Sequence, residues 1–190
     1  MQCIVRRKNT IRSCRAETRI TISFLKKCNL QIELFEPKTQ EELLRCYELV
    51  VRTNQLNMSG VKYTQEEFQT VLKRSGHTSF AFSCKDDFGA YGIVGFGQYT
   101  VENNTLVFRE FAMSCRVAGK YVESALFAAL LEKNRCNVGV FSVQKTQKNA
   151  LLRKTLEEIG FTKNENDADR ACYSFDAGLK NAGLVRGVWR

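Results

Sequence analysis

The sequence predicts one domain of the α/β (α+β) class, in which a mixed central sheet is flanked by helices. Runs of apolar or alternating side chains, typical of strands, are separated by segments with the period of amphipathic helices. These segments follow the order β-α-α-β-β-β-α-β-α-β, which combines hairpins with helical crossovers. The length of 190 residues and the apolar content of 44% suit a single domain with a sizeable core.

The first elements are a strand and two helices. Residues Gln31–Glu36 alternate apolar and polar side chains, as a half-buried strand does, and Pro37 ends this strand. Capping boxes at Thr39–Glu42 and Thr64–Glu67 predict two helix starts, because the Thr hydroxyl and the Glu carboxylate each satisfy a backbone N–H. The inward side chains are predicted to be Leu43, Cys46, Tyr47 and Val50 in the first helix, and Phe68, Val71 and Leu72 in the second.

Three strands are predicted next. Thr78–Cys84 and Ile93–Val101 are rich in β-forming residues and flank a turn with Gly and Asp, which predicts a hairpin. Asn103 and Asn104 predict a second turn. The apolar run Leu106–Met113 is then the third strand of an antiparallel set.

The last part of the domain alternates helices and strands. Val122–Lys133 is rich in Ala and Leu and predicts a helix, and Val138–Val143 predicts a strand. A further helix is predicted to end at Gly160, which suits a left-handed C-terminal cap. Ala171–Phe175 predicts a final short strand.

The net charge of +9 is concentrated at the two ends of the chain. Residues 1–30 contribute +7 and residues 177–190 contribute +3, so the remainder carries −1. We therefore expect a basic, disordered tail over residues 1–22, a folded domain over 23–176, and a basic C-terminal tail over 177–190. A nearly neutral body does not favour nucleic acid as a partner.

The cysteines and the apolar runs indicate a cytoplasmic protein. None of the eight cysteines forms a Cys-x-x-Cys pair, which favours buried, reduced thiols over a disulfide framework. A single His makes a zinc site of His and Cys ligands unfavourable, so we expect no metal. The apolar stretches are far shorter than a transmembrane span, so no membrane is expected as a partner.

The most informative segment is the polar loop Arg116–Tyr121, which lies between a predicted strand and a predicted helix. Such a loop directs backbone N–H groups and the positive end of the helix dipole toward one point, where an anion such as a pyrophosphate can bind. An ordinary strand-to-helix turn is the other interpretation. The predicted cofactor-binding residues are Met113, Ser114, Arg116, Val117, Ala118, Gly119, Lys120 and Tyr121.

These segments resemble the acyl-CoA-binding half of the GNAT acyltransferase fold. Its motif, Arg/Gln-x-x-Gly-x-Gly/Ala, matches at Arg116 and Gly119, while Tyr121 stands where a small residue is usual. The order of segments Arg52–Asn57, Asp87–Phe96 and Met113–Val117 resembles the GNAT-like C-terminal region of FkbH-like proteins, which belong to HAD-superfamily subfamily IIIC. Those proteins join a HAD domain to this region and make glyceryl or related acyl thioesters on acyl carrier proteins.

The resemblance implies a binding site and a cofactor. In the GNAT fold, the strand ending near Ser114 and the strand Val138–Val143 are expected to separate, and a thioester arm enters between them. The ligand would be acetyl-CoA, another acyl-CoA or a phosphopantetheine thioester. Asn149 matches an Asn that binds the pantetheine arm, although it also suits the first turn of a helix.

Catalytic residues are less evident. Glu110 lies near the end of its strand, where a carboxylate can act as a general base through water, or it can pair with Arg109 on the surface. Many GNAT enzymes have a Tyr acid at the position that Leu156 occupies, and Leu cannot donate a proton.

The candidate substrate-binding set follows the first helix. It consists of Thr53, Asn54, Gln55 and Asn57, whose amide and hydroxyl groups can orient a hydroxyacyl group or simply end the helix with Asx turns.

The leading hypothesis is a GNAT-like domain that binds an acyl or glyceryl thioester on CoA or an acyl carrier protein. The alternative is a non-catalytic docking module of the same fold. Expected partners are an acyl carrier protein, a HAD-family domain on a separate chain, or both. Binding of nucleic acid by the Arg-rich tail is a weaker hypothesis, because the tail lacks interleaved aromatic residues.

Overall fold

The computed structural model describes residues 22–190, so the tail predicted over residues 1–22 lies almost wholly outside the described residues. Residues 22–27 are helical and precede the first strand. The strands are β1 (Gln31–Phe35), β2 (Thr78–Asp86), β3 (Gly89–Glu102), β4 (Thr105–Met113), β5 (Val138–Gln144), β6 (Thr162–Asn166), β7 (Arg170–Phe175) and β8 (Arg186–Trp189). The helices are α2 (Gln40–Arg52), α3 (Gln65–Leu72), α4 (Val122–Asn134) and α5 (Ala150–Ile159), with 3₁₀ turns η1 (Cys115–Val117) and η2 (Ala182–Leu184).

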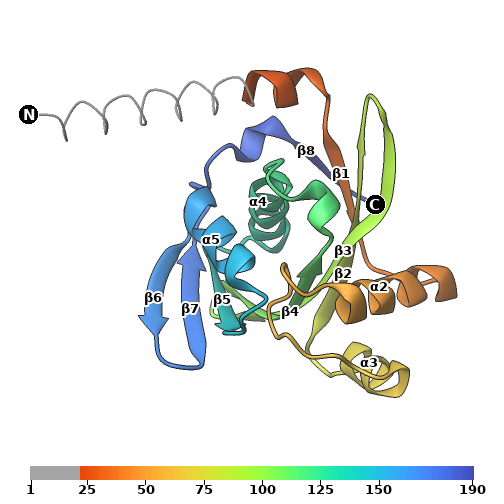
Figure 1. Cartoon of the computed structure of the whole chain (residues 1–190), viewed down its shortest axis with the longest axis vertical. Helices are drawn as coiled ribbons and strands as arrows, with labels where there is room; N and C mark the ends of the chain where they lie inside the picture. The colour runs from red at the N-terminus through yellow and green to blue at the C-terminus, as the bar shows by residue number, and fades with distance from the viewer. Residues whose placement is uncertain (1–21) are drawn as a thin grey trace, which may run out of the picture.

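The strands form one mixed sheet, as the sequence predicts. Its order is β6-β7-β5-β4-β3-β2-β1-β8 (Figure 1). Neighbours pair antiparallel except β4 with β5 and β1 with β8, which are parallel. The parallel pair β4–β5 is joined through α4, the helical crossover that the order of elements predicts.

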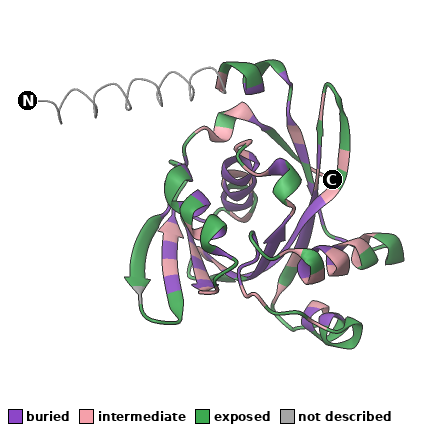
Figure 2. Ribbon diagram, viewed as in Figure 1, coloured by how far each residue is buried: buried purple, intermediate pink, exposed green. Residues whose placement is uncertain are grey.

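Helices cover both faces of the sheet. The larger core contains α4 and α5 side chains, and a smaller core on the other face contains Cys46, Val50 and Phe68 from α2 and α3. Helix α4 has buried side chains on all sides and lies at the centre of the molecule in this view (Figure 2). Its Phe127 contacts the rings of Phe108, Phe111, Phe141, Phe161 and Phe175.

The predicted helix signals are present. Thr39 and Glu42 form a complete capping box at the start of α2, and Thr64 and Glu67 form another at α3. Gly160 ends α5 with φ +113°, a left-handed conformation that favours glycine, and the Phe161 N–H donates to the Leu156 carbonyl at 2.9 Å.

Strands β4 and β5 separate, which confirms the predicted split. Their parallel pairing begins at Thr105 with Val138 and ends at Phe108 with Phe141. Strand β4 continues to Met113 and β5 to Gln144, so the second half of each strand lacks the other as a partner. The split opens toward η1 and the start of α5, and it positions the site described below.

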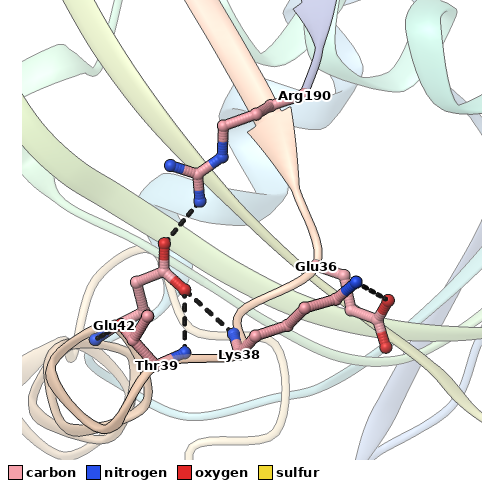
Figure 3. Close-up of polar contacts among 5 residues, drawn as sticks. All are labelled: Glu36, Lys38, Thr39, Glu42 and Arg190. Atoms are coloured by element: carbon pink, nitrogen blue, oxygen red, sulfur yellow. Dashed lines mark hydrogen bonds and ion pairs between the residues drawn. The ribbon is translucent and has the colours of Figure 1, made fainter.

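The C-terminal segment differs from the prediction. Residues 177–190, predicted as a tail, contain β8, which pairs parallel with β1. Leu179 and Val185 are buried, and the Arg190 side chain contacts the capping residue Glu42 (Figure 3). Strand β8 has only four residues and includes Gly187, so it lacks the periodic pattern that identifies a strand. The polar edge strand β6, Thr162–Asn166, was missed for the same reason.

Other features of the described residues bear on chemistry. Cys28, Cys46, Cys84 and Cys136 are buried free thiols, whereas Cys115 is exposed. Within residues 22–190, no group of three or more His, Cys, Asp or Glu side chains is arranged to hold a metal ion. Over the same range, the helices are too short or too polar to cross a membrane.

Candidate functional site

A cleft of about 660 Å³ lies beside the mouth of the β4–β5 split. Four parts of the chain form it: the last turns of α2, the loop that follows α2, the end of β4 with η1, and the loop before α5. The lining residues are Arg45, Glu48, Leu49, Arg52, Thr53, Asn54, Gln55, Leu56, Met113, Ser114, Cys115, Arg116, Gln147 and Lys148.

The cleft brings together two sets of residues that the sequence places sixty positions apart. Thr53, Asn54 and Gln55, from the predicted substrate-binding set, line one wall. Met113, Ser114 and Arg116, from the predicted cofactor-binding set, line the same cleft. Their hydroxyl, amide and guanidinium groups are suited to holding a ligand with both hydroxyl and anionic groups.

The cleft carries an excess of positive charge. Arg45 and Arg52 both contact Glu48, at 2.7 Å and 3.6 Å. Arg116 and Lys148 also line the cleft, so four cationic side chains accompany one carboxylate. Arg45 and Lys148 were not predicted as site residues from the sequence, because a cation on a helix or in a loop is usually solvated. For Lys148, the signal available in the sequence was its position directly before Asn149.

The rest of the Arg116–Tyr121 loop lies outside the cleft. Val117 is buried, and its N–H donates to the Ser114 carbonyl at 3.3 Å, while the Ala118 N–H donates to the Cys115 carbonyl at 3.2 Å. Gly119 and Tyr121 adopt left-handed conformations, with φ +73° and +59°. Because two of its N–H groups have internal partners, the loop offers fewer free donors than the sequence predicts.

Lys120, also in the predicted set, is turned toward the β2–β3 hairpin. Its Nζ donates to the Tyr91 hydroxyl at 2.7 Å and lies 4.3 Å from the centre of that ring. The Tyr91 hydroxyl donates to Asp86 at 2.6 Å. Lys120 is thus engaged in a contact between the loop and the hairpin.

Glu123, in the first turn of α4, was not predicted as a site residue. Its side chain is only 2% exposed, and one carboxylate oxygen, Oε1, lacks a hydrogen-bond partner. Burial raises the pKa of Glu123 to about 7, although the backbone N–H groups of Glu123 and Gly119 act in the opposite direction. A carboxylate therefore already faces the Gly119 N–H, one of the loop amides that the sequence assigned to a phosphate.

The β4–β5 split is filled by the chain itself. We call residues Leu56–Met58 the closing segment. The Met58 N–H donates to the Phe111 carbonyl at 2.8 Å, and the Met113 N–H donates to the Leu56 carbonyl at 2.9 Å, so the segment pairs with β4. The Met58 carbonyl accepts from the Gln144 N–H of β5 at 3.0 Å. The closing segment thus bridges both walls of the split.

Two buried asparagines hold the closing segment. Asn57 Nδ2 donates to the carbonyls of Val50 and Thr53 near the end of α2, at 3.2 and 3.3 Å, and its Oδ1 accepts from the Gly60 N–H at 2.7 Å. Asn149 Nδ2 donates to the Asn57 carbonyl at 3.2 Å. Both asparagines are fully buried, so neither predicted binding residue faces the cleft.

Glu110 is likewise buried and does not line the cleft. Its Oε2 accepts from the hydroxyls of Ser59 at 2.9 Å and Tyr63 at 2.8 Å. Burial raises the pKa of Glu110 above its ordinary value, against these hydrogen bonds. Leu156, where the resemblance places an acid, is fully buried in the core.

The comparisons with known proteins identify the fold. No protein-family model matches the sequence, and no curated protein sequence matches it significantly. Among solved structures, the ribosomal-protein-S18-alanine N-acetyltransferase of Escherichia coli aligns with a TM-score of 0.53 and 13% identity, over 80% of this chain and 97% of the other.

Two further structures agree. Spermidine N-acetyltransferase from Vibrio cholerae, in complex with CoA and spermine, has a TM-score of 0.54 and 13% identity, over 80% and 97% of the two chains. A protein from Desulfovibrio desulfuricans described as a GNAT-family acetyltransferase has a TM-score of 0.55 and 15% identity, over 78% and 99%. The mixed sheet, its flanking helices and these neighbours together show that the chain has the GNAT acetyltransferase fold.

Proposed function

We propose that this chain binds a phosphopantetheine thioester carried by an acyl carrier protein, and that it holds this ligand in the cleft. The observation that carries the proposal is the joint placement of Thr53, Asn54 and Gln55 with Ser114 and Arg116 around one cavity. Amide and hydroxyl groups can orient a glyceryl or other hydroxyacyl group. The cationic side chains favour the phosphate of the carrier's prosthetic group.

A carrier-borne thioester suits this cleft better than free CoA does. The closing segment closes the split to the arm of either ligand. Glu123, however, faces the Gly119 N–H of the loop where the pyrophosphate of CoA is expected, and a carrier's phosphopantetheine has no pyrophosphate. Carrier proteins are generally acidic. Arg52 and Lys148 at the cleft would favour the encounter by long-range attraction.

The proposal assigns a binding role and no transfer step. Glu110 is bound by Ser59 and Tyr63 beneath the surface, and Leu156 cannot donate a proton. Glu48, the carboxylate that lines the cleft, is paired with Arg45 and Arg52. An acyltransferase reaction would need a general base or acid beside the thioester, and these contacts do not support one.

The second candidate is a docking module that recognises the carrier protein surface without its prosthetic group. The occupied split favours it, because the split is where a thioester arm would enter. The two candidates differ in one respect: a docking module binds apo and holo carrier protein equally, whereas a thioester-binding domain prefers the acyl-loaded holo form.

The experiment is calorimetric titration with acyl-loaded holo carrier protein, apo carrier protein and CoA. We expect loaded carrier to bind at least about tenfold more tightly than apo carrier. Arg116→Gln and Lys148→Gln should each weaken that binding, while Lys154→Gln, an exposed cation paired with Glu158 outside the cleft, serves as the matched control. Equal binding of apo and loaded carrier would support the docking module, and no binding of any of the three ligands would refute both.

A further inference from the structure

We propose that one end of the sheet forms a surface that binds anionic lipid headgroups, and that Phe24 and Phe88 insert into the membrane interface there. We call the surface formed by Phe24, Lys26, Lys85, Phe88 and Arg186 the anchor surface. These residues do not line the cleft, so binding to lipid is independent of the carrier ligand proposed above. The expectation that no membrane is a partner rested on the length of the apolar stretches, and a surface anchor does not span a membrane.

Three parts of the chain meet at this end of the sheet. They are the helix that precedes β1, the turn of the β2–β3 hairpin, and the start of β8 (Figure 1). The Asp87 N–H donates to the Cys28 carbonyl at 3.0 Å, and Asn29 Nδ2 donates to Asp87 Oδ2 at 2.7 Å. The Arg186 N–H donates to the Leu30 carbonyl at 3.1 Å. These hydrogen bonds hold the helix, the turn and the strand together as one surface.

Two aromatic side chains at this end face the solvent. Phe24 is 57% exposed and Phe88 is 79% exposed, and among residues 22–190 they are the only aromatic residues in the set of exposed large apolar side chains. Phe24 lies one helical turn before Cys28, which contacts the hairpin turn that carries Phe88. Turns favour Gly, Asn and Asp, so the backbone does not require an aromatic residue at position 88. Two exposed rings at one end of a domain indicate a binding surface.

Cationic side chains accompany the two rings. Gln31 of β1 pairs with Lys85 of β2 on one side and with Arg186 of β8 on the other, so the three side chains form a row on one face of the sheet. Lys26 and Arg186 line one hollow of about 360 Å³, which no carboxylate of the described residues lines. Lys26, Lys85 and Arg186 are exposed, and within residues 22–190 they form no ion pair. These cations are therefore available to an anionic partner.

The two carboxylates of the hairpin turn hold the turn in place. Asp86 Oδ1 accepts from the N–H groups of Phe88 and Gly89, at 2.9 and 3.1 Å, and Asp87 accepts from Asn29. Both carboxylates thus fix the turn that presents Phe88. The exposed cations at this end outnumber them and are Lys26, Lys27, Lys85 and Arg186. The anchor surface therefore has an excess of positive charge.

The chain that precedes this helix adds to the positive charge. Residues 1–21 join the described residues directly before the helix that carries Phe24, and they contain six Lys or Arg and one Glu. Aromatic rings in the headgroup region and cations against anionic lipids are the two interactions that hold peripheral proteins to a membrane. A protein partner would pack against a contiguous apolar centre, whereas Ser23 and Asp87, next to the two rings, are polar and exposed. The surface thus fits an anionic lipid headgroup layer better than a folded partner.

The test is sedimentation of the full chain with vesicles of phosphatidylcholine alone and of phosphatidylcholine with about 30% phosphatidylserine. We expect the anionic vesicles to bind at least about tenfold more tightly, and this binding to weaken as salt is added. Phe24→Ser combined with Phe88→Ser should weaken binding to anionic vesicles by about tenfold or more, because it removes both rings. Lys85→Gln combined with Arg186→Gln should also weaken it by about tenfold.

Matched controls lie elsewhere on the sheet. Val101→Ser changes a side chain that is 50% exposed at the other end of β3, far from the hairpin turn. Lys163→Gln removes an exposed cation from β6, the edge strand opposite β8. Both control variants should bind anionic vesicles within about twofold of wild type.

A second measurement reports insertion even if the serine variants do not fold. Phe88→Trp places an indole in the hairpin turn, and its emission should shift to shorter wavelength with anionic vesicles and be quenched by brominated lipid chains. Trp189, half-buried beneath Lys133, provides the background signal of the wild type.

Three results would overturn the proposal. The first is the absence of wild-type sedimentation with anionic vesicles. The second is wild-type affinity in the serine double variant, because the charge of the chain would then be sufficient; a loss of affinity for acidic carrier protein in that same variant would assign the surface to a protein partner. The third is an unchanged emission of Phe88→Trp on vesicles that bind it. Failure of the carrier titration described above would leave all three vesicle results unaffected.

Discussion

Asn149 Nδ2 donates to the backbone carbonyl of Asn57 at 3.2 Å, across ninety-two positions of sequence. The same nitrogen donates to the Gln144 carbonyl at the end of β5, at 2.7 Å. One side chain therefore joins the start of α5, the end of β5 and the closing segment. The resemblance assigns this Asn to the pantetheine arm, and here its donors are satisfied by the chain.

Replacement of Asn149 tests this junction. Asn149→Ala should lower the free energy of unfolding by about 2 kcal/mol, because it leaves the buried Asn57 carbonyl and the half-buried Gln144 carbonyl without this donor. Asn54→Ala, an exposed amide in the loop after α2, should change stability by less than about 0.5 kcal/mol. Urea unfolding measures both. Equal effects of the two substitutions would show that the junction does not stabilise the fold.

The pH dependence of stability should report on Glu123. Its pKa is about 7 in the folded chain and lies near 4.5 in the unfolded chain. The folded state therefore binds more protons between these values, and this residue's contribution to stability falls as pH rises from about 4.5 to about 7. Relative to wild type, Glu123→Gln should gain up to about 3 kcal/mol between pH 4.5 and pH 8. Unfolding free energies of both proteins across that range measure the difference, and parallel curves would contradict it.

Glu110 should matter for stability and not for ligand binding. Glu110→Gln replaces one carboxylate oxygen with a donor, so either the Phe111 N–H on Oε1 or the two hydroxyls of Ser59 and Tyr63 on Oε2 lose their acceptor. We expect a loss of about 2 kcal/mol in stability. The affinity for loaded carrier protein should stay within about twofold of wild type, since Glu110 does not line the cleft. A large loss of affinity in a stable variant would restore Glu110 as a site residue.

Removal of residues 186–190 tests whether the C-terminal segment is part of the fold and not a tail. The truncation deletes β8 and the backbone hydrogen bonds from Arg186 to Leu30 and from Arg190 to Leu34. It also removes the contact of Arg190 with Glu42, whose pKa is lowered to about 2, mainly by the N–H groups of Lys38 and Thr39. Stability should fall by about 3 kcal/mol. An unchanged thermal midpoint would show that the segment is the tail that its composition suggested.

Much of the fold could be predicted because local signals were strong. The capping boxes at Thr39 and Thr64 placed two helix starts, and Gly160 placed a helix end. The order of elements predicted the β4–β5 split. Strand β8 was missed because its four residues carry no periodic pattern, and it forms only where the edge of β1 is available.

The site could be predicted only in part. Thr53–Gln55 and Arg116 were identified from the sequence and share the cleft. Asn57 and Asn149 were predicted to bind ligand, but their side chains donate to backbone carbonyls. Asn57 donates to Val50 and Thr53, and Asn149 donates to Gln144 and to Asn57, ninety-two positions away. A hydrogen bond to a distant carbonyl leaves no pattern in the sequence, and neither does the buried Glu123 beside its loop.

The most direct measurement is a nuclear magnetic resonance titration of the labelled domain with acyl-loaded holo carrier protein. The account predicts shifts of backbone resonances at Thr53–Gln55, Ser114, Arg116 and Lys148, which surround the cleft. The amides of Met58 and Gln144, which pair inside the filled split and do not line the cleft, should keep their shifts and their slow exchange. Loss of the Met58 and Gln144 signals, with the cleft resonances unchanged, would contradict binding in the cleft and place the thioester arm in the split.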